Sequence, residues 1–202
     1  MAITNYTTLQ TAIGDWLHRS DLTSYIPDFI SIAEANLSAD LHVRSMESRT
    51  TLTCTASNAY VSVPTDMMGM RRLVVTTSSP YQVLKYISPD ELYADYSTTR
   101  TGTPAVFTVI GSQIQLAPIP DAAHTLELTY LQKIPALSVG SPTNWLITAW
   151  PNAYLFASLC AAQPFIANDP RLPVFQQQYQ EAVQNINSID WYSGSTMIVR
   201  AS

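Results

Sequence analysis

The 202-residue chain has few charged side chains, and this scarcity excludes some functions. Charged residues make up 12% of the sequence, about half of the usual ~25%. The net charge is −5 and the basic residues are scattered, which argues against a module that grips duplex DNA, because such a module carries a basic patch. A surface of uncharged polar residues permits close self-association, although a Thr- and Ser-rich β protein would have the same composition.

Glycines and cysteines are also scarce. The six glycines are isolated from one another, so no glycine-rich loop is available to cradle a phosphate. Cys54 and Cys160 lie far apart without metal-ligand spacing, which fits neither a zinc site nor a disulfide framework. We therefore expect two free, buried thiols in a reducing compartment. The first residues lack a basic region followed by an apolar stretch, so we expect no signal peptide.

Residues with catalytic potential are not grouped along the chain. His18, His42 and His124 lie in separate segments, and each is expected to be a surface or capping residue. There is no G-x-S-x-G motif, and the acidic pair Asp90-Glu91 begins a predicted helix, where the helix dipole favours it. We predict that the chain is not an enzyme and has no catalytic residues, no cofactor and no metal.

One apolar segment, from Trp145 to Ala162, is long enough to resemble a membrane span. Polar residues interrupt it, and no basic residue flanks it closely. We therefore interpret it as a core helix and predict no membrane partner. Pro151 is expected either to kink this helix or to restart it.

Helical periodicity is found towards both ends of the chain. Residues 7–18 and 27–41 are predicted to form a helical hairpin, and the first helix is expected to begin with a capping box at Thr7 and Gln10. The last helix is Gln-rich and amphipathic and ends near Asp190. Its buried face is expected to carry Phe175, Tyr179, Ala182, Val183 and Ile186.

The middle of the chain changes to a period of two, which is typical of strands. Strands are predicted over 50–55, 59–63, 70–77, 81–87, 105–110, 113–116 and 125–132. A short helix is predicted from Ser88 to Tyr96. Gly111 is expected at the first position of a tight hairpin turn, and the strand before it is predicted to be buried on both faces.

Helices at both ends can pack together only if the β part is looped out between them. We therefore predict an α+β fold whose terminal helices form a four-helix unit. The inserted antiparallel β module is expected to be a sandwich or a small barrel, and an extended C-terminal tail follows. The predicted parts are an N-terminal helical hairpin (1–49), the β module with one short helix (50–134), a C-terminal helical hairpin (135–190) and the tail (191–202).

The tail is the main candidate for an interaction site. Its first residues, Ser193-Gly194-Ser195, favour flexibility, and the apolar residues after them favour a strand. An apolar tail in water favours docking, on the chain's own β module, on a neighbour's sheet or in a partner's groove. The aromatic pair Trp191-Tyr192 at the start of the tail fits an interface anchor and a helix-end staple equally well. The predicted interface residues are Trp191, Tyr192, Ser193, Gly194, Thr196, Met197, Ile198, Val199 and Arg200.

Segments spread over almost the whole chain are similar to those of one known family. They are Trp16 to Leu22 and Ile26 to Ile30 near the start, Val63-Pro64 and Met70 to Leu73 at the entry to the β part, Leu126 to Tyr130 and Asn144-Trp145-Leu146 at its exit, and Ser193 to Arg200 in the tail. In this order they resemble the head-to-tail adaptor (connector) proteins of tailed bacteriophages.

This resemblance implies a structural virion protein that works by binding alone. It implies a twelvefold ring beneath the portal that connects the capsid to the tail and continues the DNA channel. The implied partners are copies of the chain itself, the portal protein, a tail nozzle or other tail and neck proteins, and genomic double-stranded DNA that passes through the lumen without sequence-specific binding. The implied location is the neck and tail at the portal vertex of the virion, with assembly in the host cytoplasm.

An alternative is another neck or tail structural role, or a receptor-side binding module. A glycan-binding module would expose aromatic side chains on the β part. Tyr81, Tyr86 and Tyr130 are available for this, although tyrosines in strands are more often half-buried packing residues.

Overall fold

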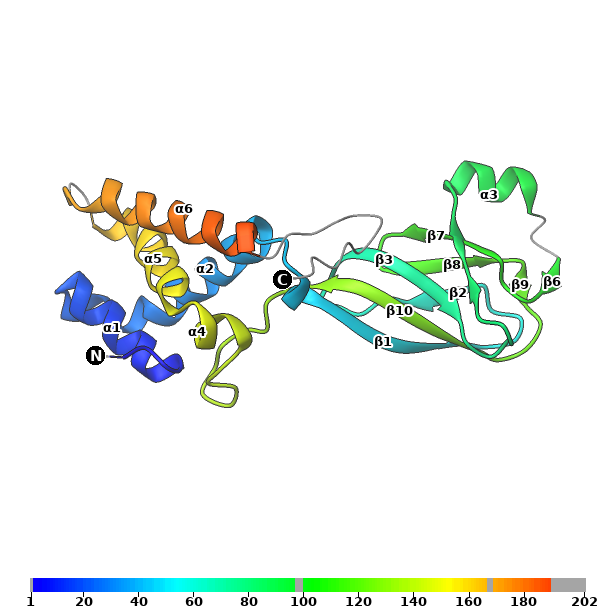
Figure 1. Cartoon of the computed structure of the whole chain (residues 1–202), viewed down its shortest axis with the longest axis horizontal. Helices are drawn as coiled ribbons and strands as arrows, with labels where there is room; N and C mark the ends of the chain where they lie inside the picture. The colour runs from blue at the N-terminus through cyan, green and yellow to red at the C-terminus, as the bar shows by residue number, and fades with distance from the viewer. Residues whose placement is uncertain (1, 97–99, 167–168, 190–202) are drawn as a thin grey trace, which may run out of the picture. The chain divides into compact units, whose positions relative to one another are not determined.

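The computed structural model describes residues 2–96, 100–166 and 169–189 of the chain (Figure 1). It divides the chain into a helical unit, made by residues 1–46 and 134–202, and a β-rich unit, made by residues 47–133. Helices from before and after the insertion pack together, and small β-sheets lie in the insertion. The prediction of an α+β fold is thus confirmed.

The helical unit is built around α5. This helix packs against α1, α2 and α6, which come from both ends of the chain. The largest buried side chains of the unit include Phe29, Tyr154 and Phe175. The elements are α1 (Tyr6–Leu17), the 3-10 helix η1 (Ser20–Tyr25), α2 (Ile26–Asp40), η2 (Arg44–Met46), α4 (Trp145–Ala149), α5 (Pro151–Ala161), η3 (Gln163–Phe165) and α6 (Leu172–Ile189).

The start of α1 differs from the prediction. Asn5 is the N-cap, and its side-chain oxygen accepts a hydrogen bond of 2.9 Å from the Thr8 backbone N–H. The Thr8 hydroxyl oxygen in turn accepts from the Asn5 backbone N–H at 3.0 Å. The predicted capping box at Thr7 and Gln10 is therefore wrong, because Asn5 and Thr8 satisfy the free N–H groups of the first turn from two residues earlier in the chain.

Pro151 restarts the helix rather than bending it. The helix α4 ends before Trp150, whose φ of −136° and ψ of 61° are not helical, and α5 begins with Pro151. Proline suits this first position because it has no N–H to leave without a partner there. On α6, the predicted buried face is confirmed for Phe175, Ala182 and Ile186.

In its described residues, the β-rich unit contains two four-stranded sheets and one two-stranded sheet. The first sheet has the strand order β1-β10-β3-β4, the second has the order β2-β8-β7-β5, and the small sheet pairs β6 with β9. The elements are β1 (Glu47–Cys54), β2 (Tyr60–Ser62), β3 (Met67–Val75), β4 (Gln82–Val83), β5 (Lys85–Tyr86), α3 (Pro89–Asp95), β6 (Thr101–Gly102), β7 (Val106–Ile110), β8 (Gln113–Ala117), β9 (Ile119–Pro120) and β10 (His124–Gln132).

The two four-stranded sheets share one hydrophobic core. Leu73 and Leu128 from the first sheet and Phe107 and Ile114 from the second all belong to the same buried cluster. Strand residues alternate between the two faces of a sheet, so the neighbours of Phe107 face the other way. There the side chain of Leu92 in α3 packs in a second cluster with Ile87, Val106 and Ala117. The helix α3 therefore covers the outer face of the second sheet.

Three predictions about the strands are wrong in part. Residues 81–87 form not one strand but two, because β4 pairs with β3 in the first sheet and β5 pairs with β7 in the second. Two pairs, β5 with β7 and β6 with β9, are parallel rather than antiparallel. The strand β7 is buried on both faces only as far as Thr108, and Ile110 is exposed. The turn after it is as predicted, with Gly111 at φ +60°.

The cysteines are free, and only one of them is buried. Cys54 is buried in the core of the β-rich unit, whereas Cys160 is half-buried on α5. The prediction of two buried thiols is therefore wrong for Cys160, which follows the buried Leu159 on its helix. No helix in the described part of the chain is long and apolar enough to span a membrane.

Candidate interaction surfaces

The predicted interface residues, Trp191 to Gly194 and Thr196 to Arg200, lie outside the described residues. The helix that leads to them, α6, is described to Ile189. Its polar side chains tie it to the end of α2. The Tyr179 hydroxyl donates to Asp40 Oδ2 at 2.5 Å, and the Asn187 amide donates to the Asp40 carbonyl oxygen at 3.0 Å. Burial is the main cause that raises the pKa of Tyr179, and the hydrogen bond to Asp40 raises it further. The last described turns of the chain are thus held at a fixed place.

An open groove of about 520 Å³ lies beside the last turns of α6. The half-buried rings of Trp145 and Trp150 line it together with Ile186. Its other lining residues are Val43, Arg44, Ser45 and Ala149. Apolar aromatic side chains at an open groove are typical of protein-binding surfaces. The groove therefore belongs to the surfaces of the helical unit on which another protein segment could pack.

A buried polar network holds the chain where it returns to the helical unit. The Leu137 backbone N–H donates to Glu34 Oε1 at 2.7 Å, and the Tyr154 hydroxyl donates to the same oxygen at 3.3 Å. The Asn144 amide donates to the Tyr154 hydroxyl at 2.6 Å and to the Pro135 carbonyl oxygen at 2.7 Å. Residues 134–144 are thus fastened to α2 and α5 by satisfied buried groups.

Burial perturbs the ionisation of this network. Desolvation raises the pKa of Glu34, although its hydrogen bonds from Leu137 and Tyr154 act in the opposite direction. Desolvation also raises the pKa of Tyr154, and the neighbouring Glu34 adds to that effect. No sequence motif marks these residues, because Glu34 is separated from Leu137 and Tyr154 by the whole inserted unit.

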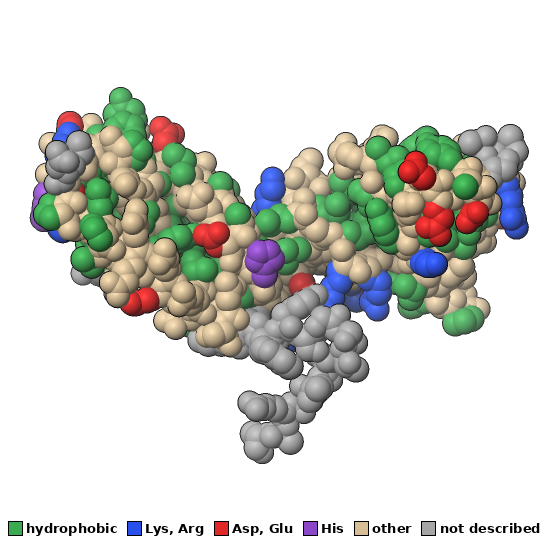
Figure 2. Space-filling model, turned by 90° about the horizontal axis from the view of Figure 1, so that it is seen from above, with side chains coloured by type: hydrophobic (Ala, Val, Ile, Leu, Met, Phe, Trp, Pro, Cys, Tyr) green, Lys and Arg blue, Asp and Glu red, His purple; other side chains and the backbone are tan. Residues whose placement is uncertain are grey.

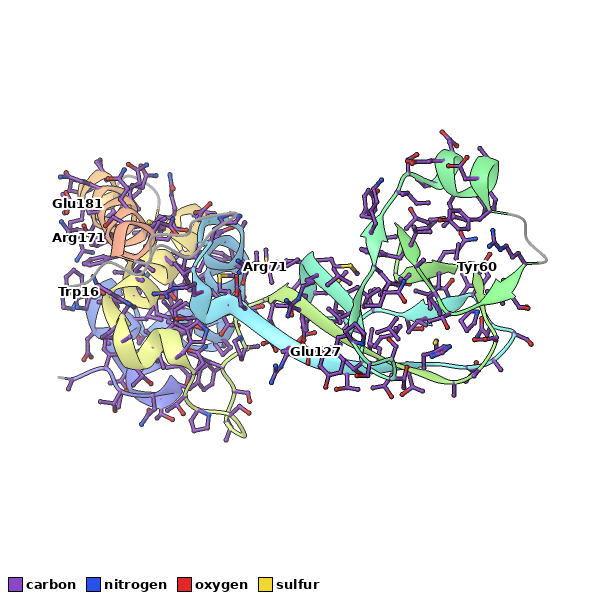
Figure 3. All side chains as sticks on the ribbon, turned by 45° about the vertical axis from the view of Figure 1, so that its right-hand side comes forward. Trp16, Tyr60, Arg71, Glu127, Arg171 and Glu181 are labelled. Atoms are coloured by element: carbon purple, nitrogen blue, oxygen red, sulfur yellow. The ribbon has the colours of Figure 1, made fainter. Side chains whose placement is uncertain are left out.

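An aromatic cluster joins α1, α5 and α6. The Trp16 ring meets Phe156 and Phe175 edge-on, with ring centroids 5.8 and 5.9 Å apart; Figure 3 labels Trp16. Arg171 donates to the Trp16 carbonyl oxygen at 3.0 Å and pairs with Asp169 at 2.7 Å. The hydrogen bonds from Arg171 lower the pKa of Asp169. The indole of Trp16 is nevertheless 42% exposed, so part of this cluster faces the surface.

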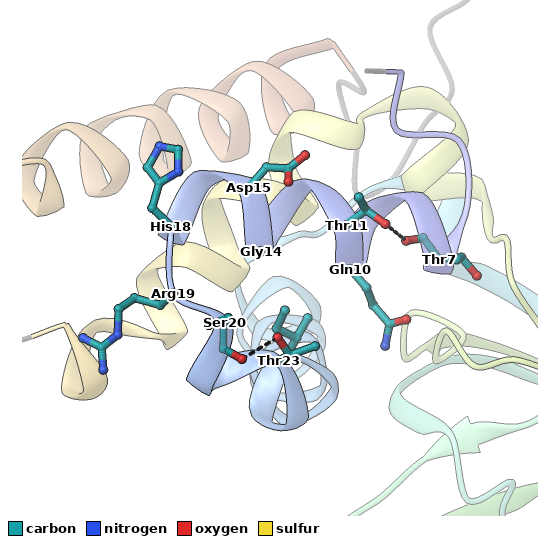
Figure 4. Close-up of a pocket in the computed structure, with 10 residues that line it drawn as sticks. Thr7, Gln10, Thr11, Gly14, Asp15, His18, Arg19, Ser20 and Thr23 are labelled. Atoms are coloured by element: carbon teal, nitrogen blue, oxygen red, sulfur yellow. Dashed lines mark hydrogen bonds between the residues drawn. The ribbon is translucent and has the colours of Figure 1, made fainter.

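A second groove, of about 660 Å³, lies between α1 and η1 (Figure 4). Its walls carry Thr7, Thr11 and Thr23, and its floor includes Gly14. Two of the hydroxyls are already used within the groove region, because Thr11 donates to the Thr7 carbonyl oxygen and Thr23 to that of Ser20. The groove is open, and most of its lining residues are polar.

Arginines gather on the outer face of the first sheet of the β-rich unit. Arg49 on β1 and Arg72 on β3 lie opposite Thr129 of the central strand β10, one on each side. Glu127 lies between them, with its carboxylate oxygens 3.6 Å from Arg49 and 3.7 Å from Arg72. Arg71 forms an ion pair with Glu47 on the edge strand. We call Arg49, Arg71, Arg72, Glu47 and Glu127 the arginine face; Figure 3 labels Arg71 and Glu127.

The histidines do not form a catalytic or metal-binding group. His18 is the left-handed C-cap of α1, as the prediction of a surface or capping role requires. His124 Nε2 lies 3.1 Å from Asp121, and its Nδ1 lies 3.0 Å from the Thr77 hydroxyl. Within residues 2–96, 100–166 and 169–189, no cluster of His, Cys, Asp and Glu side chains is placed to hold a metal ion.

The three tyrosines of the alternative binding role have different surroundings. Tyr81 and Tyr86 are exposed, at 70% and 58% of their surface. Tyr130 is buried, and its hydroxyl donates to Asp66 at 3.3 Å. The interpretation of Tyr130 as a glycan-binding residue is therefore wrong, because its ring belongs to the core between the sheets.

A comparison with known protein families gives a match that covers nearly the whole chain. The profile of the SU10 adaptor protein family matches residues 4–200 of the 202. Among curated proteins, none matches the chain significantly. The match includes both units and extends into the segment after α6. The chain therefore belongs to the SU10 adaptor protein family, a family of structural phage proteins with a head-to-tail adaptor role.

Proposed function

We propose that this protein forms a ring of twelve copies beneath the portal, where it connects the capsid to the tail and continues the DNA channel. The observation that carries the proposal is the family match over residues 4–200. The proposal adds the ring, its stoichiometry and the channel to the head-to-tail role of the family. The proposal also includes that the terminal helices form a four-helix unit and that the two four-stranded sheets form a sandwich.

The C-terminal tail is proposed as the segment that contacts the portal or the next subunit. Support comes from α6, whose last described turns are fastened to α2 through Tyr179 and Asn187. A fixed starting point lowers the conformational entropy that a following segment loses on docking. The proposed contact residues are Trp191 and Tyr192 at its base and Thr196 to Arg200 beyond Ser193-Gly194-Ser195.

Double-stranded DNA is proposed to pass through the ring without being gripped. A net charge of −5 per copy supports this, since tight binding of phosphates requires many basic contacts. An acidic ring repels the phosphate backbone weakly over a Debye length of ~8 Å at physiological salt. Such a surface would let DNA slide in either direction.

Light scattering on the purified chain, alone and with the portal protein of the same phage, tests the proposal. Full-length protein should give a ring mass or a portal complex, and a chain that ends at Tyr192 should give neither. A second variant, Ile198→Asp, separates the loss of an apolar contact from the loss of chain length, and Thr196→Ser is its matched control. A full-length chain that stays monomeric and ignores the portal would contradict the proposal.

A further inference from the structure

The arginine face presents its positive charge outward. The side chains of Arg49 and Arg72 are 71% and 54% exposed, whereas that of Glu127 between them is only 27% exposed. Arg71 likewise is more exposed than its partner Glu47. The carboxylates therefore lie beneath the guanidinium groups. With three arginines and two glutamates, the face carries one net positive charge on a chain whose overall charge is −5.

The opposite side of the same unit presents negative charge. There α3 covers the outer face of the second sheet through Leu92, and its exposed residues include Asp90, Glu91 and Asp95. Tyr93 is also exposed, but its hydroxyl donates to Gln115 of the second sheet at 3.4 Å. No ion pair joins these three carboxylates to any residue that the structure describes. Figure 2 shows acidic side chains gathered on one part of the β-rich unit, with basic side chains beside them and a further basic group elsewhere on the unit.

These two surfaces lie on opposite sides of one core. The arginine face is the outer face of the first sheet, and α3 lies on the outer face of the second, with the shared hydrophobic cluster between the sheets. A ring with rotational symmetry needs two different, complementary patches on each subunit, because every contact is head-to-tail. The β-rich unit by itself meets this requirement.

We propose that, in the ring, α3 of one copy docks on the arginine face of the next copy. The inference rests on the proposed ring and names the contact that closes it. Asp90, Glu91 and Asp95 would face the guanidinium groups of Arg49 and Arg72, so that opposite charges meet at each contact.

The composition of the arginine face favours another copy over DNA as the occupant. Each arginine of the face is already opposed by a glutamate, whereas a surface that binds DNA gains its affinity from several unopposed basic residues. Two strands of the face also carry threonines (Thr51, Thr53, Thr125 and Thr129), whose hydroxyls can pair with carboxylates at close range. A helix with three carboxylates complements such a face in charge.

Charge reversal with rescue tests this contact. R49E/R72E reverses the face and E91K/D95K reverses the helix, so each variant alone should assemble at least about tenfold less well than the natural chain, because like charges then meet at every contact. The chain that carries all four changes should assemble again. A 1:1 mixture of the two double variants should also assemble, since each reversed surface then meets a reversed partner. Ring mass is measured by light scattering, with and without portal protein.

Controls separate this contact from folding and from the ring itself. R19E changes an arginine of the helical unit that is also ion-paired and whose side chain is 47% exposed, and it should leave assembly unchanged. Far-UV circular dichroism and urea unfolding report whether each variant is folded. If reversal unfolds the sheet, the milder R49Q/R72Q should weaken assembly and reduce its salt dependence.

The remaining outcomes all count against the inference. Folded variants that assemble like the natural chain, or a fourfold variant that is not rescued, overturn the docking of α3 while the ring stands. If R49E/R72E leaves the ring intact but changes its retention of a fluorescent 30-base-pair duplex (a length of about 100 Å), the face is turned to DNA instead. A natural chain that forms no ring, even with portal, overturns the proposed function and this contact together.

Discussion

Replacing Asn144 with alanine should destabilise the helical unit more than the loss of a helix cap alone. The Asn144 side-chain oxygen accepts from the Ile147 backbone N–H at 2.9 Å, as the N-cap of α4. Its amide nitrogen donates to the Pro135 carbonyl oxygen and to the Tyr154 hydroxyl. The substitution therefore removes three hydrogen bonds, and one of them ends on a fully buried ring.

The magnitude follows from these contacts. Loss of an N-cap costs about 1 kcal/mol, and each of the other two hydrogen bonds contributes about 1 kcal/mol net, which gives about 3 kcal/mol in total. Asn5 provides a matched control in the same unit. Its side chain caps α1 with a hydrogen bond of the same length, 2.9 Å, from Thr8. Asn5→Ala should cost only about 1 kcal/mol.

Urea unfolding followed by far-UV circular dichroism measures the difference. Both variants should keep the slope of the free energy against urea and shift the midpoint, with the larger shift for Asn144→Ala. If the two variants lose the same free energy of unfolding, the bonds to Pro135 and Tyr154 contribute nothing, and the buried network does not fasten the return segment.

Four further substitutions test the fold. Burial raises the pKa of Glu34 above its ordinary value of 4.5. The native state therefore binds this proton more tightly than the unfolded chain does, and stability falls as pH rises from about 4.5 through the raised native pKa. Glu34→Gln should remove this fall, which is measured as the free energy of unfolding against pH. Gly111→Ala should lower the free energy of unfolding by ~1–2 kcal/mol because Gly111 has φ +60°. Gly69 has open space around it, so Gly69→Ala should be neutral or stabilise by up to ~1 kcal/mol. Thermal unfolding measures both. Phe175→Ala, at a position 2% exposed, should lose ~3–5 kcal/mol in urea unfolding; a loss below ~1 kcal/mol would contradict its place in the core.

Periodicity predicted the elements more reliably than their pairing partners. The helical and strand periods placed α2, α6, β7 and β10 to within a few residues, because a buried face repeats every 3.6 or every 2 residues. The same pattern could not show that residues 81–87 divide between two sheets. Alternation records which side chains are buried, and it says nothing about which neighbouring strand supplies the hydrogen bonds.

Local capping chemistry was less certain than periodicity. Thr7 with Gln10 matches the sequence pattern of a capping box, whereas the structure uses Asn5 with Thr8, a pair outside that pattern. The sequence pattern alone therefore did not locate the first residue of the helix.

The sequence by itself determined the class of this protein. Its order of helical and strand periods required an α+β fold with the β part looped out, and its end-to-end similarity to phage adaptors identified the family. Only the tertiary structure showed that Glu34, Asn144 and Tyr154 share one network. It alone placed the arginine face and α3 on opposite sides of one core. The physical reason is that local periods depend on neighbours along the chain, whereas ion pairs, buried networks and opposed surfaces depend on strand order and on contacts between residues far apart in sequence.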